Sequence, residues 1–386
     1  MKGYFTFHPV GRGQFYTGRI INDNTNEEIN FIYDIGTSKT ESIINKEVTQ
    51  YCKETKKVDF VILSHLHKDH INGIYCLLNS GIKVDSIIMP YLNPTQLLFI
   101  FEEALSSIKS RLIRSKSGKE YQQYYDFLFS FYSNPYASIK KINNTCKVIV
   151  YSSRDISTIE TLDGEAYNLE EVKDKKDILL TSFQNSNYIV KSSSGGIYSV
   201  CPKNTSVINY KGWMFDLKQP GADQSIGEEM KKIGLEILDA MLDNKEETVN
   251  LKIKESKKFR DNKNCITLEH YPLFQDLSNT HTLLMGDCDV NKIYTPPNGQ
   301  LSSGKEYYVI QIPHHGSRVD ANLNIDSKSE YSVVCHNKTD DSHPDDETMK
   351  AYGKITTNPI IQVTEEKNSY FQYCYEDKTM VVKPKT

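Results

Sequence analysis

Apolar residues in the first 90 positions follow strand-like spacing, with one helical interruption. Runs rich in aromatic and β-branched residues, separated by Gly or Asn, predict strands over residues 4–10, 14–22 and 30–34. Helical spacing predicts a helix over 41–53, whereas the continuous apolar runs 58–64 and 82–89 are typical of buried strands. This part of the chain therefore has the pattern of a sheet with a helix packed against it.

The apolar pattern changes between residues 90 and 260. Helical spacing predicts helices over 97–112, 121–131 and 226–241, a strand pattern occupies 147–151, and 152–222 is polar and irregular. Strand patterns resume at 266–269, 281–286, 307–312, 331–335 and 360–364. Because strands occupy both ends, we predict one α/β domain over 1–386 with a largely helical insertion at about 92–260, a candidate substrate cap.

The composition limits the class of protein more than its function. Hydrophobic residues make up 38% and charged residues 25% of the 386 residues, which is typical of a globular protein. The formal net charge of −4 provides no overall basic field that would support nucleic-acid binding. No apolar run is long enough to span a membrane, and the eight cysteines include no Cys-x-x-Cys pair, so we expect a cytoplasmic protein with free thiols.

The strongest chemical signal follows the apolar run 58–64. It is a His-x-His-x-Asp-His motif formed by His65, His67, Asp69 and His70. Imidazole nitrogens and a carboxylate suit zinc and related divalent ions. Residues two apart in an extended segment point the same way, so His65 and His67 can bind one ion, while Asp69 and His70 on the following turn face a second. With only ten histidines in the chain, a chance cluster in a polar loop is a poor alternative.

This motif resembles the signature of the metallo-β-lactamase superfamily. Tyr33-Asp34-Ile35-Gly36 resembles the family's early Asp-x-Gly element, whose aspartate holds the metal loop by hydrogen bonds and is not a ligand. Leu283-Leu284-Met285-Gly286-Asp287 resembles the strand that supplies a metal-bridging aspartate. Ile312-Pro313-His314-His315-Gly316-Ser317 resembles the strand end that supplies a histidine to the second metal. The resemblance implies the αββα sandwich of that superfamily.

The most similar branch is the hydrolase domain attached to competence-type DNA-uptake channels, together with its free-standing relatives. The matching pieces are the hairpin Val10-Gly11-Arg12-Gly13-Gln14, the strand entry Asn262-Lys263-Asn264-Cys265-Ile266, the His-His-Gly-Ser block and His343-Pro344. The resemblance covers about 1–90 and 260–365 and leaves the middle of the chain unexplained.

The resemblance implies two divalent metal ions, zinc or alternatively manganese. The implied ligands are His65, His67, Asp69, His70, Asp287 and His315. The choice between His314 and His315 is open, although a final ligand immediately before Gly favours His315 and leaves His314 to face the substrate. The superfamily often has one more metal histidine, for which His270 and His281 are the candidates, but a core or surface position suits them better. We interpret His8 and His336 as structural.

The implied reaction is direct attack by a hydroxide held between the two ions. Asp69 and Asp287 would orient this hydroxide and accept its proton, and His314 or His343 would protonate the leaving oxygen. Acidic residues surround His343, so a solvated loop is an equal interpretation of that position. Arg12 and Ser317 are candidate contacts for an anionic substrate.

The leading hypothesis for the substrate is a phosphodiester, in nucleic acid or a nucleotide. It rests on the competence-type resemblance, with modest support from basic residues interleaved with aromatic ones. These residues are Lys109, Arg111, Arg114, Lys116, Lys119, Tyr121, Tyr124 and Tyr125. The alternatives are hydrolysis of a carbon ester, thioester or lactam, and a regulatory protein, for example in a defence module, whose insertion binds a protein partner. The oligomeric state is open between monomer and homodimer.

Overall fold

The computed structural model describes most of both ends of the chain and separate pieces of its middle. The described residues are 1–90, 100, 119–133, 135–151, 206–210, 213–218, 233, 236, 247–248, 251–252, 265–273, 278–289, 304–319, 325–339 and 342–383. The helices predicted over 97–112 and 226–241 lie almost entirely outside these residues, as do residues 109–118 of the basic cluster.

An eight-stranded mixed sheet is built from the N-terminal strands and the C-terminal hairpin, in the order β15-β14-β1-β2-β3-β4-β5-β6. β3 to β6 run parallel to one another, whereas β15, β14, β1, β2 and β3 pair antiparallel. The strands are β1 (Lys2–Phe7), β2 (Phe15–Ile21), β3 (Glu28–Ile35), β4 (Lys57–Ile62), β5 (Lys83–Pro90), β6 (Lys147–Tyr151), β14 (Phe371–Glu376) and β15 (Thr379–Val382).

A seven-stranded mixed sheet lies against the first one, in the order β13-β12-β11-β10-β9-β8-β7. β10 to β13 are parallel, and β7, β8, β9 and β10 pair antiparallel. The strands are β7 (Ser206–Tyr210), β8 (Trp213–Lys218), β9 (Thr267–Pro272), β10 (Thr282–Leu284), β11 (Glu306–Gln311), β12 (Lys328–Cys335) and β13 (Ile361–Val363).

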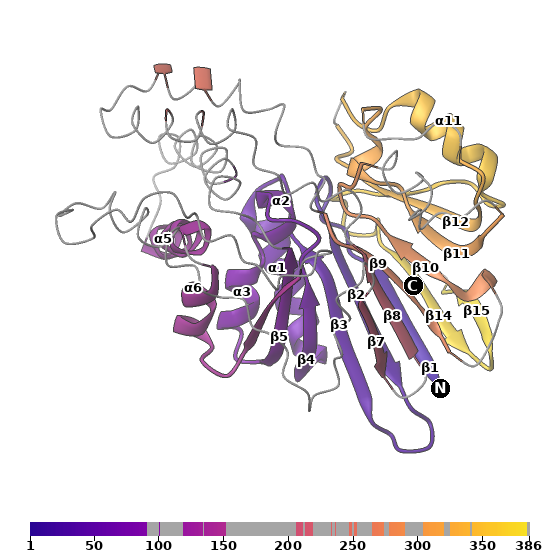
Figure 1. Cartoon of the computed structure of the whole chain (residues 1–386), viewed down its shortest axis with the longest axis horizontal. Helices are drawn as coiled ribbons and strands as arrows, with labels where there is room; N and C mark the ends of the chain where they lie inside the picture. Colours follow the sequence, from indigo (N-terminus) through magenta and orange to yellow (C-terminus); the bar gives the residue numbers. More distant parts are fainter. Residues whose placement is uncertain are drawn as a thin grey trace.

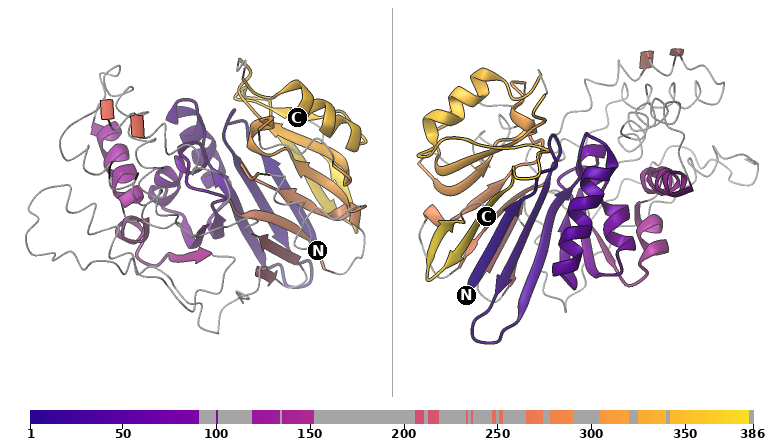
Figure 2. Two further views of the ribbon diagram at one scale, coloured as in Figure 1. Left: turned by 45° about the horizontal axis from the view of Figure 1, so that its top comes forward. Right: turned by 180° about the vertical axis from the view of Figure 1, so that it is seen from behind.

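Three hydrophobic cores separate four layers of helix, sheet, sheet and helix (Figures 1 and 2). Aromatic residues fill the core between the two sheets, because alternate residues of each strand point to opposite faces. Helices cover the outer face of the eight-stranded sheet at β3 to β6, and α11 (Asp346–Ile355) covers the other sheet. The helices on the first side are α1 (Glu41–Glu54), α3 (Ile74–Asn79), α5 (Lys119–Ser133) and α6 (Pro135–Ile142).

The structure confirms an α/β architecture and most of the predicted strands, but it corrects the prediction for the middle of the chain. β6 confirms the strand predicted over 147–151, whereas β7 and β8 add two strands of the seven-stranded sheet to a stretch for which none was predicted. The interpretation of 152–222 as irregular was wrong at β7 and β8. The inward residues Trp213, Phe215 and Leu217 are buried and the intervening ones are half-buried, which is a strand alternation that the polar surroundings concealed.

No helix in the described ranges is both long enough and apolar enough to cross a membrane.

Candidate metal centre

The residues of the His-x-His-x-Asp-His motif lie at one end of both sheets. β4 is buried along nearly its whole length and ends two residues before Ser64, after which the chain turns into the one-turn helix α2 (Lys68–Ile71). On the other sheet, β10 leads to Asp287 and β11 leads to the 3-10 turn η4 (His314–Gly316). Parallel strands of one sheet deliver their carboxyl ends to the same edge, which brings the segments after β10 and β11 together. Packing of the two sheets then places this edge beside the end of β4, more than 200 residues away in the sequence.

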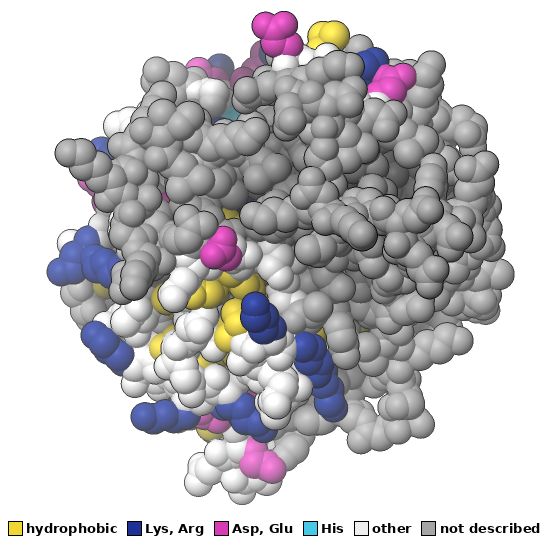
Figure 3. Space-filling view, turned by 90° about the vertical axis from the view of Figure 1, so that its left-hand side faces the viewer, with side chains coloured by type: hydrophobic (Ala, Val, Ile, Leu, Met, Phe, Trp, Pro, Cys, Tyr) yellow, Lys and Arg dark blue, Asp and Glu magenta, His cyan; other side chains and the backbone are white. Residues whose placement is uncertain are grey.

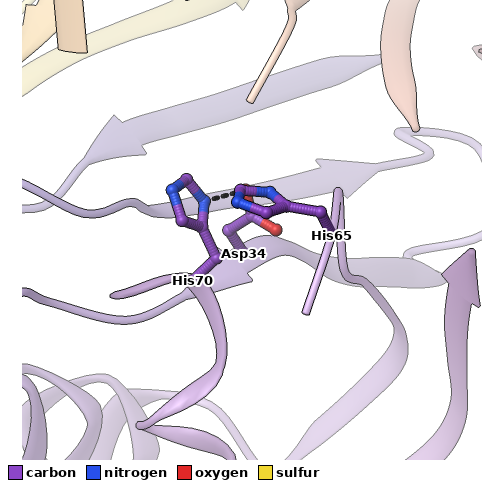
Figure 4. A group of neighbouring side chains, drawn as sticks. All are labelled: Asp34, His65 and His70. Atoms are coloured by element: carbon purple, nitrogen blue, oxygen red, sulfur yellow. Dashed lines mark hydrogen bonds and ion pairs between the residues drawn. The ribbon is translucent and has the colours of Figure 1, made fainter. Parts of the chain in front are cut away.

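Asp34 at the end of β3 anchors the metal-motif loop, residues 64–70, through hydrogen bonds. Its Oδ1 accepts from the Ser64 N–H over 2.6 Å, and its Oδ2 accepts from the Ser64 hydroxyl over 2.6 Å and from His70 Nδ1 over 2.8 Å. The carboxylate, fully buried, points at His70 and lies close to His65 (Figure 4). Asp34 is near enough to His65 and His70 to form a ligand group with them, but its oxygens are already engaged in three hydrogen bonds.

Three histidines have the same bonding pattern at Nδ1. His70 Nδ1 donates to Asp34, His65 Nδ1 to the Ser64 hydroxyl over 2.9 Å, and His315 Nδ1 to the Cys335 carbonyl over 3.0 Å. A neutral imidazole that donates at Nδ1 carries its free lone pair at Nε2. The Nε2 atoms of all three are buried and have no hydrogen-bond partner among the described residues. This is the arrangement that a divalent cation requires from histidine ligands.

Asp287 lies between these imidazoles and turns a different oxygen to each side. Its Oδ1 lies 3.1 Å from His70 Nε2 and 3.5 Å from His315 Nε2, and its Oδ2 lies 3.6 Å from His65 Nε2. Lone pairs of nitrogen and carboxylate oxygen repel each other at these distances, so a proton or a cation between them would stabilise the arrangement. Asp287 therefore presents one carboxylate oxygen to His70 and His315 and the other to His65.

Two compact ligand groups share this space. One contains His65, His67 and Asp287, and the other contains Asp69, His70 and His315, with the ligand atoms of each group within 4.8 Å of one another. The His65–His67 and Asp69–His70 pairing expected from the motif is therefore present in the folded chain. Each group combines side chains from both sheets, so neither exists before the sheets pack together.

Burial and neighbouring charges shift the pKa values of His65, Asp69, His70 and Asp287 in different directions. Burial opposes the charge on His70, but Asp287 and Asp34 outweigh this and raise its pKa well above the usual value. Burial, assisted by His70, lowers the pKa of His65 well below the usual value. Burial would raise the pKa of Asp69 and Asp287, yet the neighbouring imidazoles hold both well below the usual range. The two carboxylates are therefore ionised at neutral pH.

His314 and His315 both approach Asp287 although they are adjacent in sequence. Both have positive φ, 47° and 55°, and Gly316 follows at 82°, so the chain coils in a left-handed turn that no extended strand end would form. His315 is 2% exposed and belongs to a ligand group, whereas the His314 side chain is 24% exposed with Nε2 3.7 Å from Asp287 Oδ2. His314 is thus the more accessible of the two.

His343 lies beside His314, with ring centroids 6.0 Å apart. The Asp345 N–H donates to the Gly316 carbonyl over 3.0 Å, and a Cβ on Gly316 would lie 2.5 Å from Pro344 Cβ. The loop that carries His343 is therefore packed onto the His-His-Gly turn. A role at the site and a solvated loop are the two interpretations that the sequence leaves open for His343, and its contact with the turn places it beside the ligand groups.

The Gly-x-Gly hairpin also lies against the centre. A Cβ on Gly13 would lie 2.6 Å from the Asp69 carbonyl oxygen, which explains the glycine there. The Arg12 N–H donates to Asn337 Oδ1 over 2.8 Å. Ser317 is 5% exposed, and its N–H donates to the His314 carbonyl over 2.8 Å, so this serine belongs to the turn itself.

The remaining histidines occupy structural positions. His270 is buried in the aromatic core, where its Nε2 bonds the Tyr16 hydroxyl at 2.8 Å, and His281 bonds Glu269. His8 bonds Thr17, and His336 bonds Gln362. None of the four belongs to a ligand group found among the described residues, so the core interpretation is the better one for His270.

Sequence reasoning missed the polar side chains that support the ligands. Asn72 accepts from the Thr37 N–H over 3.0 Å and donates to the Thr37 carbonyl over 2.7 Å, which locks α2 to the loop after Asp34. Tyr132 of α5 donates to the Leu66 carbonyl inside the metal motif over 3.1 Å. The supporting role of Asn72 could have been suspected, because it lies two positions after the motif. No local sequence pattern indicates the role of Tyr132.

No protein-family model matches this sequence, and no curated protein matches it at a significant level.

Proposed function

We propose that this chain is a metal-dependent hydrolase with the metallo-β-lactamase fold. The observation that carries the proposal is the convergence of three buried Nε2 lone pairs, from His65, His70 and His315, on the carboxylate of Asp287. The two packed sheets with helices on their outer faces are compatible with that fold.

The residues present fit two divalent ions, with zinc favoured by the imidazole-rich donor set and manganese as the alternative. His65, His67 and Asp287 would hold one ion, and Asp69, His70 and His315 the other. When bound, such ions supply an activated water and stabilise negative charge that develops on the substrate. Asp34 is not a ligand in this proposal, because it orients His70 and Ser64.

The protein's own side chains would transfer the protons and contact the substrate. Asp69 and Asp287, both ionised, orient the attacking water and accept its proton. His314 is partly exposed beside Asp287, and His343 lies next to it, so this pair can deliver a proton to the leaving oxygen. Arg12 on the Gly-x-Gly hairpin and the N–H groups around Ser317 are the candidates for contacting an anionic substrate.

A phosphodiester in nucleic acid or a nucleotide is the proposed substrate, on the resemblance to the competence-type branch. Among the tyrosines of the basic cluster, Tyr124 of α5 lends it less support than expected, because it is 6% exposed and packs in the hydrophobic core on that side of the eight-stranded sheet. On the face in Figure 3, Lys and Arg side chains of the described residues are dispersed among uncharged ones and form no continuous basic surface.

A reducing compartment such as the cytoplasm is part of the proposal. The seven cysteines within the described residues are all free thiols, and five of them are buried: Cys146, Cys265, Cys288, Cys335 and Cys374. Free thiols persist where the redox environment keeps them reduced.

The test combines metal analysis with a substrate panel. Purified protein, stripped with a chelator and reconstituted with Zn²⁺ or Mn²⁺, is offered single-stranded DNA, RNA, cyclic nucleotides, and ester, thioester and lactam probes. We expect metal-dependent turnover of a phosphodiester, its loss in Asp69→Ala and Asp287→Ala, and its retention in Asp59→Asn, which changes a buried carboxylate that hydrogen-bonds the Asn30 N–H outside the ligand groups.

Each outcome decides a different part of the proposal. Turnover of the ester or lactam probes alone would overturn the phosphodiesterase assignment and keep the hydrolase. Protein that binds no divalent ion would overturn the metal centre. Full metal binding without turnover of any probe would favour a regulatory protein that binds a partner.

A further inference from the structure

Two buried glutamines join the two sheets directly behind the candidate metal centre. Gln14 lies just before β2, and Gln311 is the last residue of β11. Gln14 Nε2 donates to Gln311 Oε1 over 3.1 Å, and Gln311 Nε2 donates to Gln14 Oε1 over 2.6 Å. The two side chains are 0% and 2% exposed, so this reciprocal pair is shielded from water.

Gln311 also holds the turn that carries Asp287. Its Oε1 accepts from the N–H groups of Met285 over 2.8 Å and Gly286 over 3.1 Å. Its Nε2 lies 3.4 Å from the Gly286 carbonyl oxygen, toward which it donates a longer bond. Gly286 has a positive φ of 53°, and a Cβ there would lie 2.5 Å from the Ser64 hydroxyl, so this turn is packed against the metal-motif loop. The amide thus fixes the two peptide groups that precede Asp287.

Gln14 contacts the opposite half of the centre through its main chain. Its N–H points to the Asp69 carbonyl at 3.4 Å, and its carbonyl accepts from the Gly36 N–H over 2.8 Å. The peptide that carries Asp69 and the peptide that precedes Asp287 are therefore linked by one chain of hydrogen bonds. This chain passes through two side chains that are 297 positions apart.

We propose that Gln14 and Gln311 are positioning residues that set the separation between Asp69 and Asp287, and through it the affinity of the centre for its cations. The inference rests on the proposed function. Both ligand groups combine side chains of the two sheets, so a shift of one sheet relative to the other would spread both groups at once. An amide suits this place, because it both donates and accepts and stays neutral beside the Asp34, Asp69 and Asp287 carboxylates.

The experiment compares Gln311→Met and Gln14→Met with Tyr373→Phe. Tyr373 is the matched control, because its buried hydroxyl also joins the two sheets, at 2.8 Å from Thr282 Oγ1 and 2.7 Å from the Tyr16 hydroxyl, outside the ligand groups. Full-length protein is titrated with Zn²⁺ and with Co²⁺, the visible spectrum of bound Co²⁺ is recorded, and unfolding is followed in the presence of chelator.

We expect the two methionine variants to weaken cation binding roughly 10–100-fold and to alter the Co²⁺ spectrum, as is typical when groups that orient ligands are removed. The double variant should lose no more than the stronger single variant, because both act on one hydrogen-bonded unit. Tyr373→Phe should bind cations like the wild type. Gln311→Glu, which is nearly isosteric, is used if Gln311→Met does not fold, and should also weaken binding because it cannot donate to Gln14.

Wild-type cation affinity and an unchanged Co²⁺ spectrum in the folded glutamine variants would overturn this inference alone. Equal weakening in Tyr373→Phe would overturn it as well, since general packing of the sheets would then explain the effect. A wild-type protein that binds no cation would instead overturn the proposed function, and this inference with it.

Discussion

The Asp34 carboxylate accepts a hydrogen bond from His70 Nδ1 over 2.8 Å and so decides which nitrogen of His70 faces Asp287. A carboxylate cannot donate in its ionised form, so His70 must carry a proton at Nδ1, which leaves Nε2 as the nitrogen whose lone pair a cation can take. One buried contact at the end of β3 thereby determines the chemistry of a side chain 36 positions away.

The Asp34→Asn substitution should therefore weaken cation binding more than its small change in size suggests. The asparagine amide can donate to His70 Nδ1, which favours the tautomer protonated at Nε2 and removes a ligand lone pair. We expect roughly 10–100-fold weaker Zn²⁺ binding in a competition titration with a coloured chelator. Asp59→Asn, at a buried carboxylate outside the ligand groups, should bind Zn²⁺ normally. Equal effects in the two variants would argue against the tautomer explanation.

Substitution of His314 and of His315 should separate proton transfer from metal binding. His315→Ala removes a buried ligand, so we expect about one cation fewer per chain by elemental analysis. His314→Ala should keep both cations and lower kcat about 10²–10⁴-fold, the usual contribution of a general acid. The reverse result, with a cation lost in His314→Ala and kept in His315→Ala, would exchange the two roles.

Gly36→Ala should damage the centre without touching a ligand. The added Cβ would lie 2.3 Å from the Asp69 carbonyl oxygen and 2.6 Å from the His70 N, so the metal-motif loop must move. We expect a loss of roughly 1–3 kcal/mol in unfolding free energy, together with weaker cation binding. Gly353→Ala is the matched control in α11, where nothing lies within 4 Å of a Cβ. It should stabilise the protein by about 0.5–1 kcal/mol and leave cation binding unchanged. Wild-type stability and cation binding in the Gly36→Ala variant would contradict this prediction, because the metal-motif loop would then accommodate the added Cβ without loss of stability or affinity.

His270 should make the folded state sensitive to acid. Burial lowers its pKa from the usual 6.5 to about 3, and its Nδ1 has no hydrogen-bond partner among the described residues. Between these values the unfolded chain binds a proton that the folded chain does not, so stability present above pH 6.5 is lost as the pH falls toward 3.

The size of this effect can be isolated by comparison with His270→Gln, which keeps a polar partner for the Tyr16 hydroxyl. From about pH 7 to about pH 4.5, the wild type should lose about 3 kcal/mol more unfolding free energy than the variant, measured by urea denaturation at each pH. The metal centre titrates in both proteins and cancels in the comparison. Parallel pH profiles would mean that the folded protein accommodates a protonated His270.

The sequence by itself determined the local parts of this protein. The metal motif could be identified because His65, His67, Asp69 and His70 lie within six positions, so one strand end and one turn suffice to bring them together. Strand and helix spacing likewise predicted β1 to β5, α1 and most of the seven-stranded sheet, since the period of buried residues is a property of each segment alone.

Only the tertiary structure decided how the distant parts combine. The sequence did not reveal that β7 and β8 extend the sheet containing β9, because strand order depends on packing between segments rather than on spacing within them. It left His314 and His315 unresolved, because the left-handed turn that directs both toward Asp287 has no signature in residue spacing. The Gln14–Gln311 pair was equally invisible, because contacts between two sheets depend on how their buried faces fit together, which no single segment encodes.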